Sequence, residues 1–296
     1  MIKTLTEDNF EDFKNYCIAH RSDHDESFLY DEDLDKFIIG NNNPTYLLYR
    51  EDQVVAVCSI IQDAHHLMGN KARVRIFHSS SNMLEDYEIL LQSILPLNPM
   101  IHRIIMFIPE ENDKSRLIVE KMGFIIERYS YVMNRSNQAI TEFHFPDGFE
   151  LTDFVLNRDE NDYLHVRNTA FAHLKGSETP ITKEQVNEQM QAGKILSGGA
   201  KILRHKGEPV GIIRIEHEYD QGKDYSFIAP LAILPEYQGK GLGSQLLRAG
   251  IKTGYDNGFK DCMLSVNAEN ENALKLYYKE GFKKTFEMVC YNLKIK

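Results

Sequence analysis

Three glycines alternate over five residues near the end of the chain, at Gly239, Gly241 and Gly243. An apolar run over residues 228–234 precedes them and apolar positions at helical spacing follow them, which predicts a buried strand, a loop and the start of a helix. Glycines let the backbone approach a ligand closely, and unpaired N–H groups at a helix N-terminus bind anions. The loop is therefore a candidate phosphate site, with Lys240 as an added positive charge. A tight turn without a ligand is the alternative.

Two common nucleotide-binding motifs do not fit this loop. A P-loop requires a glycine, four residues and then Gly-Lys-Ser/Thr, and no such run follows Gly239. The dinucleotide fingerprint requires a third glycine where Ser244 stands, and it normally opens the first βαβ unit of a domain. The phosphate-bearing ligand must therefore belong to another class.

A second group of polar and small residues follows about 30 residues later. Asn270, Ala273 and Tyr277 are spaced by three and four residues, so they share one face of a predicted helix. A short apolar strand over residues 262–266 precedes this helix, and Gly281 is expected to end it. A small residue between an amide and a phenol makes a helix face against which a ligand can lie.

The two stretches together resemble the GNAT superfamily of N-acetyltransferases, and the resemblance covers roughly the last half of the chain. The matching residues are Gln238, Gly241, Gly243, Asn270, Ala273, Leu276, Tyr277, Gly281 and Phe282. The resemblance implies that the glycine loop binds the pyrophosphate of acetyl-CoA and that the preceding strand pairs with its pantetheine arm and acetyl carbonyl. The coenzyme-binding residues implied are Leu231, Ala232, Ile233, Gln238, Gly239, Lys240, Gly241, Leu242, Gly243, Ser244, Asn270, Ala273 and Tyr277.

The chemistry of acetyl transfer agrees with these residue types. The reaction passes through a tetrahedral oxyanion, which fixed N–H donors stabilise. The family resemblance gives Tyr277 the role of protonating the departing thiolate, and a phenol with a pKa of about 10 is suited to it. A core aromatic is the alternative for Tyr277. The general base is less certain: Glu216 is preferred, and the alternatives are His217, Asp220, Asp224 and Glu236.

The chain contains an internal repeat. Residues 112–124 parallel residues 270–282 without gaps, and strand-like runs precede and follow both segments. This predicts a mixed α/β (α+β) protein of two tandem acetyltransferase-like domains, each a mostly antiparallel sheet flanked by helices. We expect a degenerate domain over residues 1–140 and a catalytic, acetyl-CoA-binding domain over residues 147–296.

The first copy is expected to have lost its chemistry. Val119 stands where the second copy has Tyr277, and His78-Ser79-Ser80-Ser81-Asn82-Met83 replaces the glycine loop. The tandem arrangement resembles the mycothiol synthases, as does the run over residues 166–173 in the first helix of the second copy. Mycothiol itself is not implied. Helices over residues 159–174 and 183–192 are expected to wall the acceptor site.

Composition limits the class of protein. A formal net charge of −10 argues against a nucleic-acid partner and mildly favours an amine substrate. No apolar stretch is long enough to span a membrane, and the first residues lack the apolar core of a signal peptide, so a cytoplasmic location is expected. Four scattered cysteines indicate small buried hydrophobes: Cys17, Cys58, Cys262 and Cys290. The clusters Asp23-His24-Asp25 and His65-His66 do not match a metal-ligand spacing, so no metal is expected.

These observations favour an acetyl-CoA-dependent N-acetyltransferase. A small-molecule amine would attack the thioester directly in a ternary complex. The alternative is a catalytically silent CoA-binding sensor or scaffold that keeps the fold without turnover. The sequence does not indicate the identity of the amine or the oligomeric state.

Overall fold

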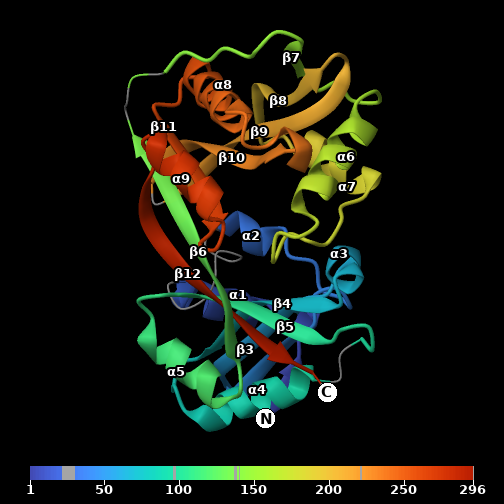
Figure 1. The fold of residues 1–296 in the computed structure, drawn as a ribbon. Helices are drawn as coiled ribbons and strands as arrows, with labels where there is room; N and C mark the ends of the chain where they lie inside the picture. The colour runs from blue at the N-terminus through green and yellow to red at the C-terminus, as the bar shows by residue number, and fades with distance from the viewer. Residues whose placement is uncertain (22–30, 96–97, 137–138, 140, 221, 296) are drawn as a thin grey trace. The chain divides into compact units, whose positions relative to one another are not determined.

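The computed structural model describes residues 1–21, 31–95, 98–136, 139, 141–220 and 222–295 (Figure 1). The chain divides into two compact units. The first consists of Met1–Tyr129 together with Met288–Lys296, and the second of Ser130–Glu287. The sequence cluster Asp23-His24-Asp25 lies outside the described residues.

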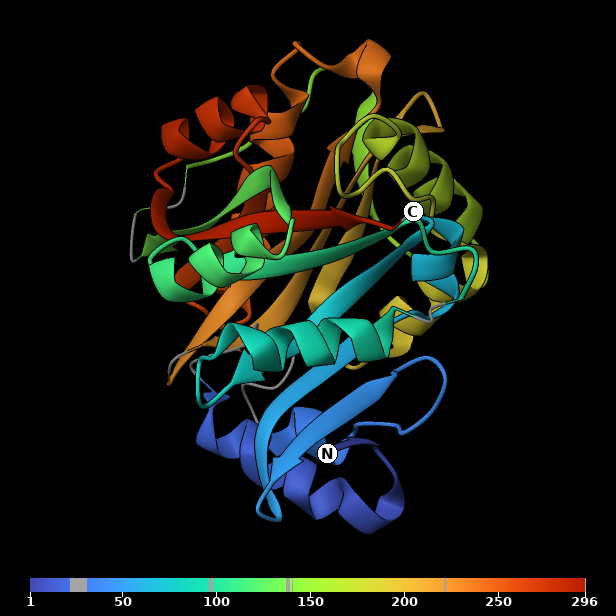
Figure 2. The ribbon, with the colours of Figure 1, turned by 90° about the horizontal axis from the view of Figure 1, so that it is seen from below.

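The first unit is a sheet in the order β1-β2-β3-β4-β5-β12, in which only β4 and β5 are parallel. Its strands are β1 (Ile2–Thr4), β2 (Thr45–Arg50), β3 (Gln53–Ile61), β4 (Lys71–Ser79), β5 (Arg103–Pro109) and the later part of β12 (Lys283–Lys294). Its helices are α1 (Phe10–Ala19), α2 (Asp31–Asp35), α3 (Ala64–Met68), α4 (Leu84–Ile94) and α5 (Asp113–Lys121). Apolar side chains of α1 and α2 pack on one face of the sheet, and those of α4 and α5 pack on the other. Figure 2 shows the ribbons of this unit's helices beside its strands.

The second unit is a sheet in the order β6-β11-β10-β9-β8-β7, in which only β10 and β11 are parallel. Its strands are β6 (Ile125–Ser136), which begins in the first unit, β7 (Phe149–Asp153), β8 (Ile195–His205), β9 (Glu208–Asp220), β10 (Lys223–Ile233) and β11 (Asp261–Asn267). Its helices are α6 (Glu160–Phe171), α7 (Lys183–Gln191), the short η4 (Pro235–Tyr237), α8 (Leu242–Asp256) and α9 (Glu271–Lys279).

Strand alternation places the helices of the second unit on opposite faces of its sheet (Figure 1). Ile213 and Ile215 of β9 face α8 and belong to the same core as Leu246. Ile212 points the other way and packs with Val166 of α6. Each face therefore buries one apolar helix stripe, and the predicted fold class is confirmed for both units.

The sequence repeat is visible in the backbone of both units. Asn112 and Asn270 each cap a helix by accepting a hydrogen bond from the amide three residues later, at 3.1 and 3.2 Å. The two helices then end at Gly123 and Gly281, which have φ of 89° and 88°. The same start and stop signals therefore build α5 and α9.

The compact units differ from the predicted boundaries, 1–140 and 147–296, because the units exchange their last strands. Residues 130–136 of β6 pair with β11 in the second unit, and residues 288–294 of β12 pair with β5 in the first unit. Both strands follow the same Gly-Phe turn and have similar patterns of apolar residues. Pattern alone therefore identifies a strand at each place without saying which edge it joins.

The cysteines and the histidine pair have structural settings. All four cysteines are buried and none of them is in a disulfide among the described residues, as expected of small hydrophobes. His66 lies in α3, where its Nδ1 is 2.7 Å from Oδ1 of the capping residue Asp63. Over the described ranges, no group of three or more His, Cys, Asp or Glu side chains is arranged to hold a metal ion. Nor does any described helix combine the length and the apolar character that a membrane span requires.

Candidate active site

The parallel strands β10 and β11 pair over only part of their length. Their ladder runs from Ser226 opposite Cys262 to Ile228 opposite Leu264, although both strands continue beyond it. At that point β10 has a bulge: Ala229 and Pro230 together oppose a single residue of β9. A bulge bends a strand and increases its twist, and proline has no N–H to donate to a ladder. The strands therefore separate and leave an opening between them.

The backbone of β10 turns polar groups toward this opening. The amide of Leu234 donates to the carbonyl of Val210 on the β9 side at 2.9 Å. Because N–H and C=O groups alternate in direction along an antiparallel strand, the groups of Leu231 and Ile233 face away from β9. One of these carbonyls, that of Ile233, accepts from Nε2 of Gln238 at 2.9 Å. The amides of Leu231 and Ile233 are thus available to a ligand between the strands.

The glycine loop has the conformation that its sequence predicts. Gly239 and Gly241 have φ of 74° and 78°, which non-glycine residues rarely adopt, and a Cβ at either would meet only open space. Gly241 is the N-cap of α8 and provides no side-chain cap. Within the described chain, the N–H groups from Gly239 to Ser244 have no protein acceptor. A row of unpaired amides at the positive end of a helix dipole is suited to anion binding.

A cavity of about 830 Å³ lies along the opening and beneath the loop. This volume is within the range of small-molecule sites, roughly 300–1,000 Å³. Twelve predicted coenzyme-binding residues line it: Leu231, Ala232, Ile233, Gln238, Gly239, Gly241, Leu242, Gly243, Ser244, Asn270, Ala273 and Tyr277. Strand, loop and helix thus bring residues that are up to 46 positions apart in the sequence (277 minus 231) around one space.

Tyr277 lies on the wall of this cavity, on the face of α9 that also presents Asn270 and Ala273. The side chain packs against Phe282 and is only 8% exposed. Burial raises the pKa of Tyr277 to about 12, so the phenol keeps its proton throughout the neutral range. No group in the described chain forms a hydrogen bond with its hydroxyl. The hydroxyl is therefore a free proton donor.

Two predicted residues do not line the cavity. The Lys240 ammonium lies 4.8 Å from the ring centre of Tyr237, as a cation–π contact, and is absent from the cavity wall. Glu216 of β9 lies beside the cavity, where its Oε1 is 2.6 Å from Nε of Arg214. Both positions are adjacent to lining residues, but their charged groups contact neighbouring side chains instead of the cavity.

The other candidate bases also lie off the cavity wall. His217 and Asp224 form an exposed pair with Nε2 and Oδ1 2.6 Å apart. Burial raises the pKa of Asp220, and Glu236 is an exposed residue of η4. Over the described residues, no carboxylate and no imidazole lines the cavity.

Four polar residues line the end of the cavity that α6, α7 and β9 form: Tyr163, Arg167, Gln189 and Arg214. Of these, the sequence indicated only Tyr163 as an inward-facing residue of its helix. The spacing of Tyr163 and Arg167 by four residues was the available signal, because it places both on one helix face. That α6 and α7 wall the acceptor site remains a prediction, and these are the polar residues that the wall would present.

The first unit has the same backbone geometry, but side chains fill the space beside its parallel strands. Its parallel strands β4 and β5 pair only from Lys71 to Arg73, and β4 has a bulge at Arg75. The corresponding cavity, lined by Asn112 and Val119, has a volume of only about 30 Å³. Aromatic side chains occupy the space, with the rings of Phe77 and Tyr87 5.2 Å apart.

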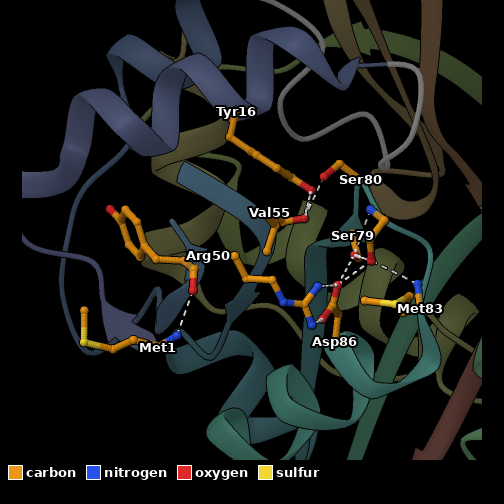
Figure 3. A network of polar contacts seen from close by, with 10 residues as sticks. Met1, Tyr16, Arg50, Val55, Ser79, Ser80, Met83 and Asp86 are labelled. Carbon is orange, nitrogen blue, oxygen red and sulfur yellow. Dashed lines mark hydrogen bonds and ion pairs between the residues drawn. The ribbon is translucent and has the colours of Figure 1, made fainter. Parts of the chain in front are cut away.

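In the first unit, the loop over residues 78–83 forms hydrogen bonds with side chains of the chain itself (Figure 3). The Asp86 carboxylate, fully buried in the first turn of α4, accepts from the hydroxyls of Ser79 and Ser81 at 2.6 Å each and pairs with the Arg50 guanidinium. Burial alone would raise the pKa of Asp86, but the two hydroxyls and the guanidinium outweigh it and lower this pKa. The Tyr87 hydroxyl accepts from the amide of Ser79 at 3.2 Å. The chain's own side chains therefore occupy the place of an external anion.

The fold and the site define a class of protein, and comparison with known families agrees with it. Residues 168–282 match the family described as Acetyltransferase (GNAT) family. This part of the chain therefore matches a GNAT acetyltransferase domain.

Particular relatives share this domain. The chain is 30% identical to a mycothiol acetyltransferase of Paenarthrobacter aurescens over 167 residues, 54% of this chain and 50% of that protein. It is 25% identical to a mycothiol acetyltransferase of Streptomyces avermitilis over 170 residues, 57% of this chain and 54% of that protein. The chain thus spans about half the length of the curated relatives it matches.

Solved structures resemble the chain over both units. A GCN5-related N-acetyltransferase from Sphaerobacter thermophilus aligns with a TM-score of 0.71 and 17% identity, over 100% of this chain and 96% of that one. A tandem GNAT protein from the clavulanic acid biosynthesis pathway aligns with a TM-score of 0.66 and 11% identity, over 99% of this chain and 98% of that one. At these identities the likeness establishes the fold alone, and that fold is a tandem GNAT arrangement.

Proposed function

We propose that this protein transfers the acetyl group of acetyl-CoA to the primary amine of a small molecule, and that the second unit carries the reaction. The proposal rests mainly on one observation, the opening between β10 and β11. Unpaired loop amides, strand amides and the Tyr277 phenol all border the single cavity at that opening. Strand amides can stabilise the oxyanion of acyl transfer and a phenol can protonate the leaving group, while the loop amides can hold a phosphate-bearing donor.

The residues present fit a diphosphate-bearing thioester. Open space above Gly239 and Gly241 leaves room for phosphate oxygens against the backbone. The amides from Gly239 to Ser244 would donate to those oxygens, since each lacks a protein acceptor in the described chain. Asn270 and Ala273 would provide the wall for the rest of the coenzyme. The thioester itself would supply the activated acetyl group.

The chain's own groups have distinct roles in the proposed reaction. The amides of Leu231 and Ile233 would hold the acetyl oxygen as it gains negative charge when the amine attacks. Tyr277 would donate its proton toward the sulfur as the carbon–sulfur bond breaks. A thiol has a pKa of about 8.5, well below that of the buried phenol, so the main contribution of Tyr277 is a hydrogen bond to the developing charge rather than early proton transfer.

Glu216 is the residue that we propose as the general base. Glu216 would take the proton of the incoming amine only through water or after rearrangement, because its carboxylate is held by Arg214. Glu216→Gln discriminates between the two roles. A base would add an acidic limb to the pH profile of kcat that the variant lacks, whereas a holder of Arg214 would change KM and leave the profile intact.

We further propose that the first unit has no coenzyme site and that the acceptor is a small molecule. The closed 30 Å³ cavity and the buried Asp86 carboxylate support the first point. Curated relatives named mycothiol acetyltransferase support the second. A formal net charge of −10 supports an acceptor that is not a nucleic acid.

One observation favours the alternative of a catalytically silent CoA-binding protein: in the described chain, the cavity wall carries no carboxylate or imidazole that could act as a base. Two measurements distinguish the possibilities. Release of free thiol from acetyl-CoA with a panel of small amines would support the enzyme. Calorimetric binding of acetyl-CoA without release would support the silent protein, and the absence of binding would contradict both.

A further inference from the structure

The charged groups of the cavity differ in sign from the chain as a whole. The protein has a formal net charge of −10, yet the only charged side chains among the described residues of the cavity wall are Arg167 and Arg214. Both lie at the acceptor end with Tyr163, and the electrostatic influence of both arginines reaches that phenol. Local charge, rather than net charge, decides which ligands enter a narrow site.

The charge of Arg214 is already balanced. Its Nε is 2.6 Å from the Glu216 carboxylate, and its Nη1 donates to Oε1 of Gln189 at 2.6 Å and to the Tyr163 hydroxyl at 3.4 Å. The side chain is also buried. The charge of Arg214 is therefore neutralised by its neighbours, and the side chain gives the cavity a polar wall rather than an unpaired cation.

Arg167 has a different set of contacts. Its Nη1 donates to the Thr179 carbonyl at 2.7 Å and to Oδ1 of Asn168 at 3.1 Å, and its guanidinium lies 5.4 Å from the ring centre of Phe171. These contacts hold the planar group in place. Its Nε and Nη2 have no hydrogen-bond partner in the described chain. That pair of donors forms the edge of a guanidinium that binds carboxylates and phosphates in a bidentate way.

Burial makes this cation costly when it is alone. Desolvation lowers the pKa of Arg167, and electrostatic interactions with Tyr163 and, to a smaller extent, Glu178 only partly oppose the effect. A desolvated charge is stabilised strongly by an opposite charge that shares hydrogen bonds with it. A site with a fixed, partly desolvated guanidinium therefore gains from an anionic ligand.

We propose that the acceptor amine also carries an anionic group, a carboxylate or a phosphate, which Arg167 binds through Nε and Nη2. This inference rests on the proposed function and names its substrate class. Arg167 is then the residue that selects amino acids or amino phosphates over neutral amines. A purely structural role is less suited to it, because Asn168 already fixes the same loop through two hydrogen bonds to Ile181, at 2.9 and 3.0 Å.

Matched pairs of amines test the selection. Acetylation of amino acids of increasing length would be compared with that of their carboxamides, and acetylation of O-phosphoethanolamine with that of ethanolamine. We expect kcat/KM to favour the anionic member of at least one pair by roughly 10- to 100-fold, the range of a charged hydrogen bond. The two series distinguish a carboxylate from a phosphate.

Variants connect the preference to the residue. Arg167→Gln should remove the preference and leave the acetyl-CoA dissociation constant unchanged, and Arg167→Lys should retain part of it. Arg158→Gln is the control, since it makes the same change of charge at an exposed site of the same unit. Equal use of acids and carboxamides by the native protein, or a preference that survives Arg167→Gln, would overturn the inference.

A binding measurement separates this inference from the proposed function. Calorimetry would compare N-acetylglycine with N-acetylglycinamide, and N-acetylated O-phosphoethanolamine with N-acetylethanolamine, in the presence of CoA. Tighter binding of an anionic member, lost in Arg167→Gln, would support the anion site even if no amine turned over. Equal binding or no binding by every pair would overturn it, even if neutral amines were acetylated and the proposed function stood.

Discussion

The two units contain two versions of one cavity, about 830 Å³ in the second unit and about 30 Å³ in the first. Both arise where a pair of parallel strands separates beside a bulge, and an asparagine-capped helix borders each. The shared backbone therefore does not decide whether a site exists. The side chains that fill it do.

The loops show the same difference in polar groups. In the second unit the amides of the glycine loop have no acceptor among the described residues, whereas in the first unit serine hydroxyls and Tyr87 accept from the amides of Ser79, Ser81 and Met83. Asp86 then brings a permanent carboxylate to the head of α4. A loop evolves away from anion binding by supplying its own anion as well as by losing glycines.

The largest expected effect comes from closing the open loop. Gly241→Glu places a carboxylate where phosphate oxygens are expected, and we predict that acetyl-CoA affinity falls by about 100-fold or more in calorimetry. Gly258→Glu is the control for backbone strain. Gly258 also has a left-handed φ, 93°, and open space around it, but it does not line the cavity. Asn82→Glu in the first unit should leave affinity unchanged. Unaltered affinity in Gly241→Glu would remove the loop assignment.

Tyr277→Phe makes the second unit resemble the first at one position, where Val119 stands. We predict that kcat falls by roughly 10²- to 10³-fold, as for the loss of one hydrogen-bond donor to a developing charge, while the acetyl-CoA dissociation constant stays nearly constant. Tyr278→Phe, at an exposed neighbouring phenol, should have no effect. A kcat equal to that of the native protein would refute the role of Tyr277.

In the first unit, Asp86→Asn tests whether the internal anion is structural. Breaking a buried ion pair costs about 3–5 kcal/mol, and we predict a loss of this size in denaturant unfolding of the first unit. The lowered pKa has a definite sign: the contribution of Asp86 is present above the unfolded pKa near 3.8 and is lost as the pH falls through the folded value. Asp35→Asn, at an exposed ion pair with Lys14, should cost less than 1 kcal/mol. A native-like stability in Asp86→Asn would contradict this account.

The smallest expected effect is the absence of an alkaline limb in the pH profile of the rate. Because the pKa of Tyr277 is raised to about 12, its proton is lost only near that pH. The rate should rise as the acceptor amine deprotonates, and Tyr277 should add no alkaline limb below about pH 11. An alkaline limb between pH 9 and 10 that disappears in Tyr277→Phe would show that the phenol is more acidic than its burial indicates.

Local spacing and the family resemblance together selected residues that the structure places around one cavity. The alternating glycines and the Asn270–Ala273–Tyr277 face depend on backbone freedom and helical period, which act over a few residues. Twelve of the thirteen predicted coenzyme-binding residues accordingly surround one cavity. Lys240 is the exception, because its long, flexible side chain packs over the Tyr237 ring instead of lining the cavity.

Tertiary contacts decided what the sequence pattern did not show. A single arginine in a helix is usually solvated, and nothing local indicates that the Thr179 carbonyl, in the loop after the helix, holds Arg167. The same is true of Glu216, whose commitment to Arg214 depends on two neighbouring positions of one strand being drawn together. The exchange of β6 and β12 could not be foreseen either, since both strands have the pattern of either edge.

That exchange means that no single cut of the chain separates the halves cleanly. A protease that opens the linker near residue 141 would leave each fragment holding the closing strand of the other's sheet. A gene encoding only residues 147–296 would produce a sheet whose β11 edge is bare and prone to self-association. The first half of the sequence therefore remains necessary to the second, because it supplies the strand that covers this edge.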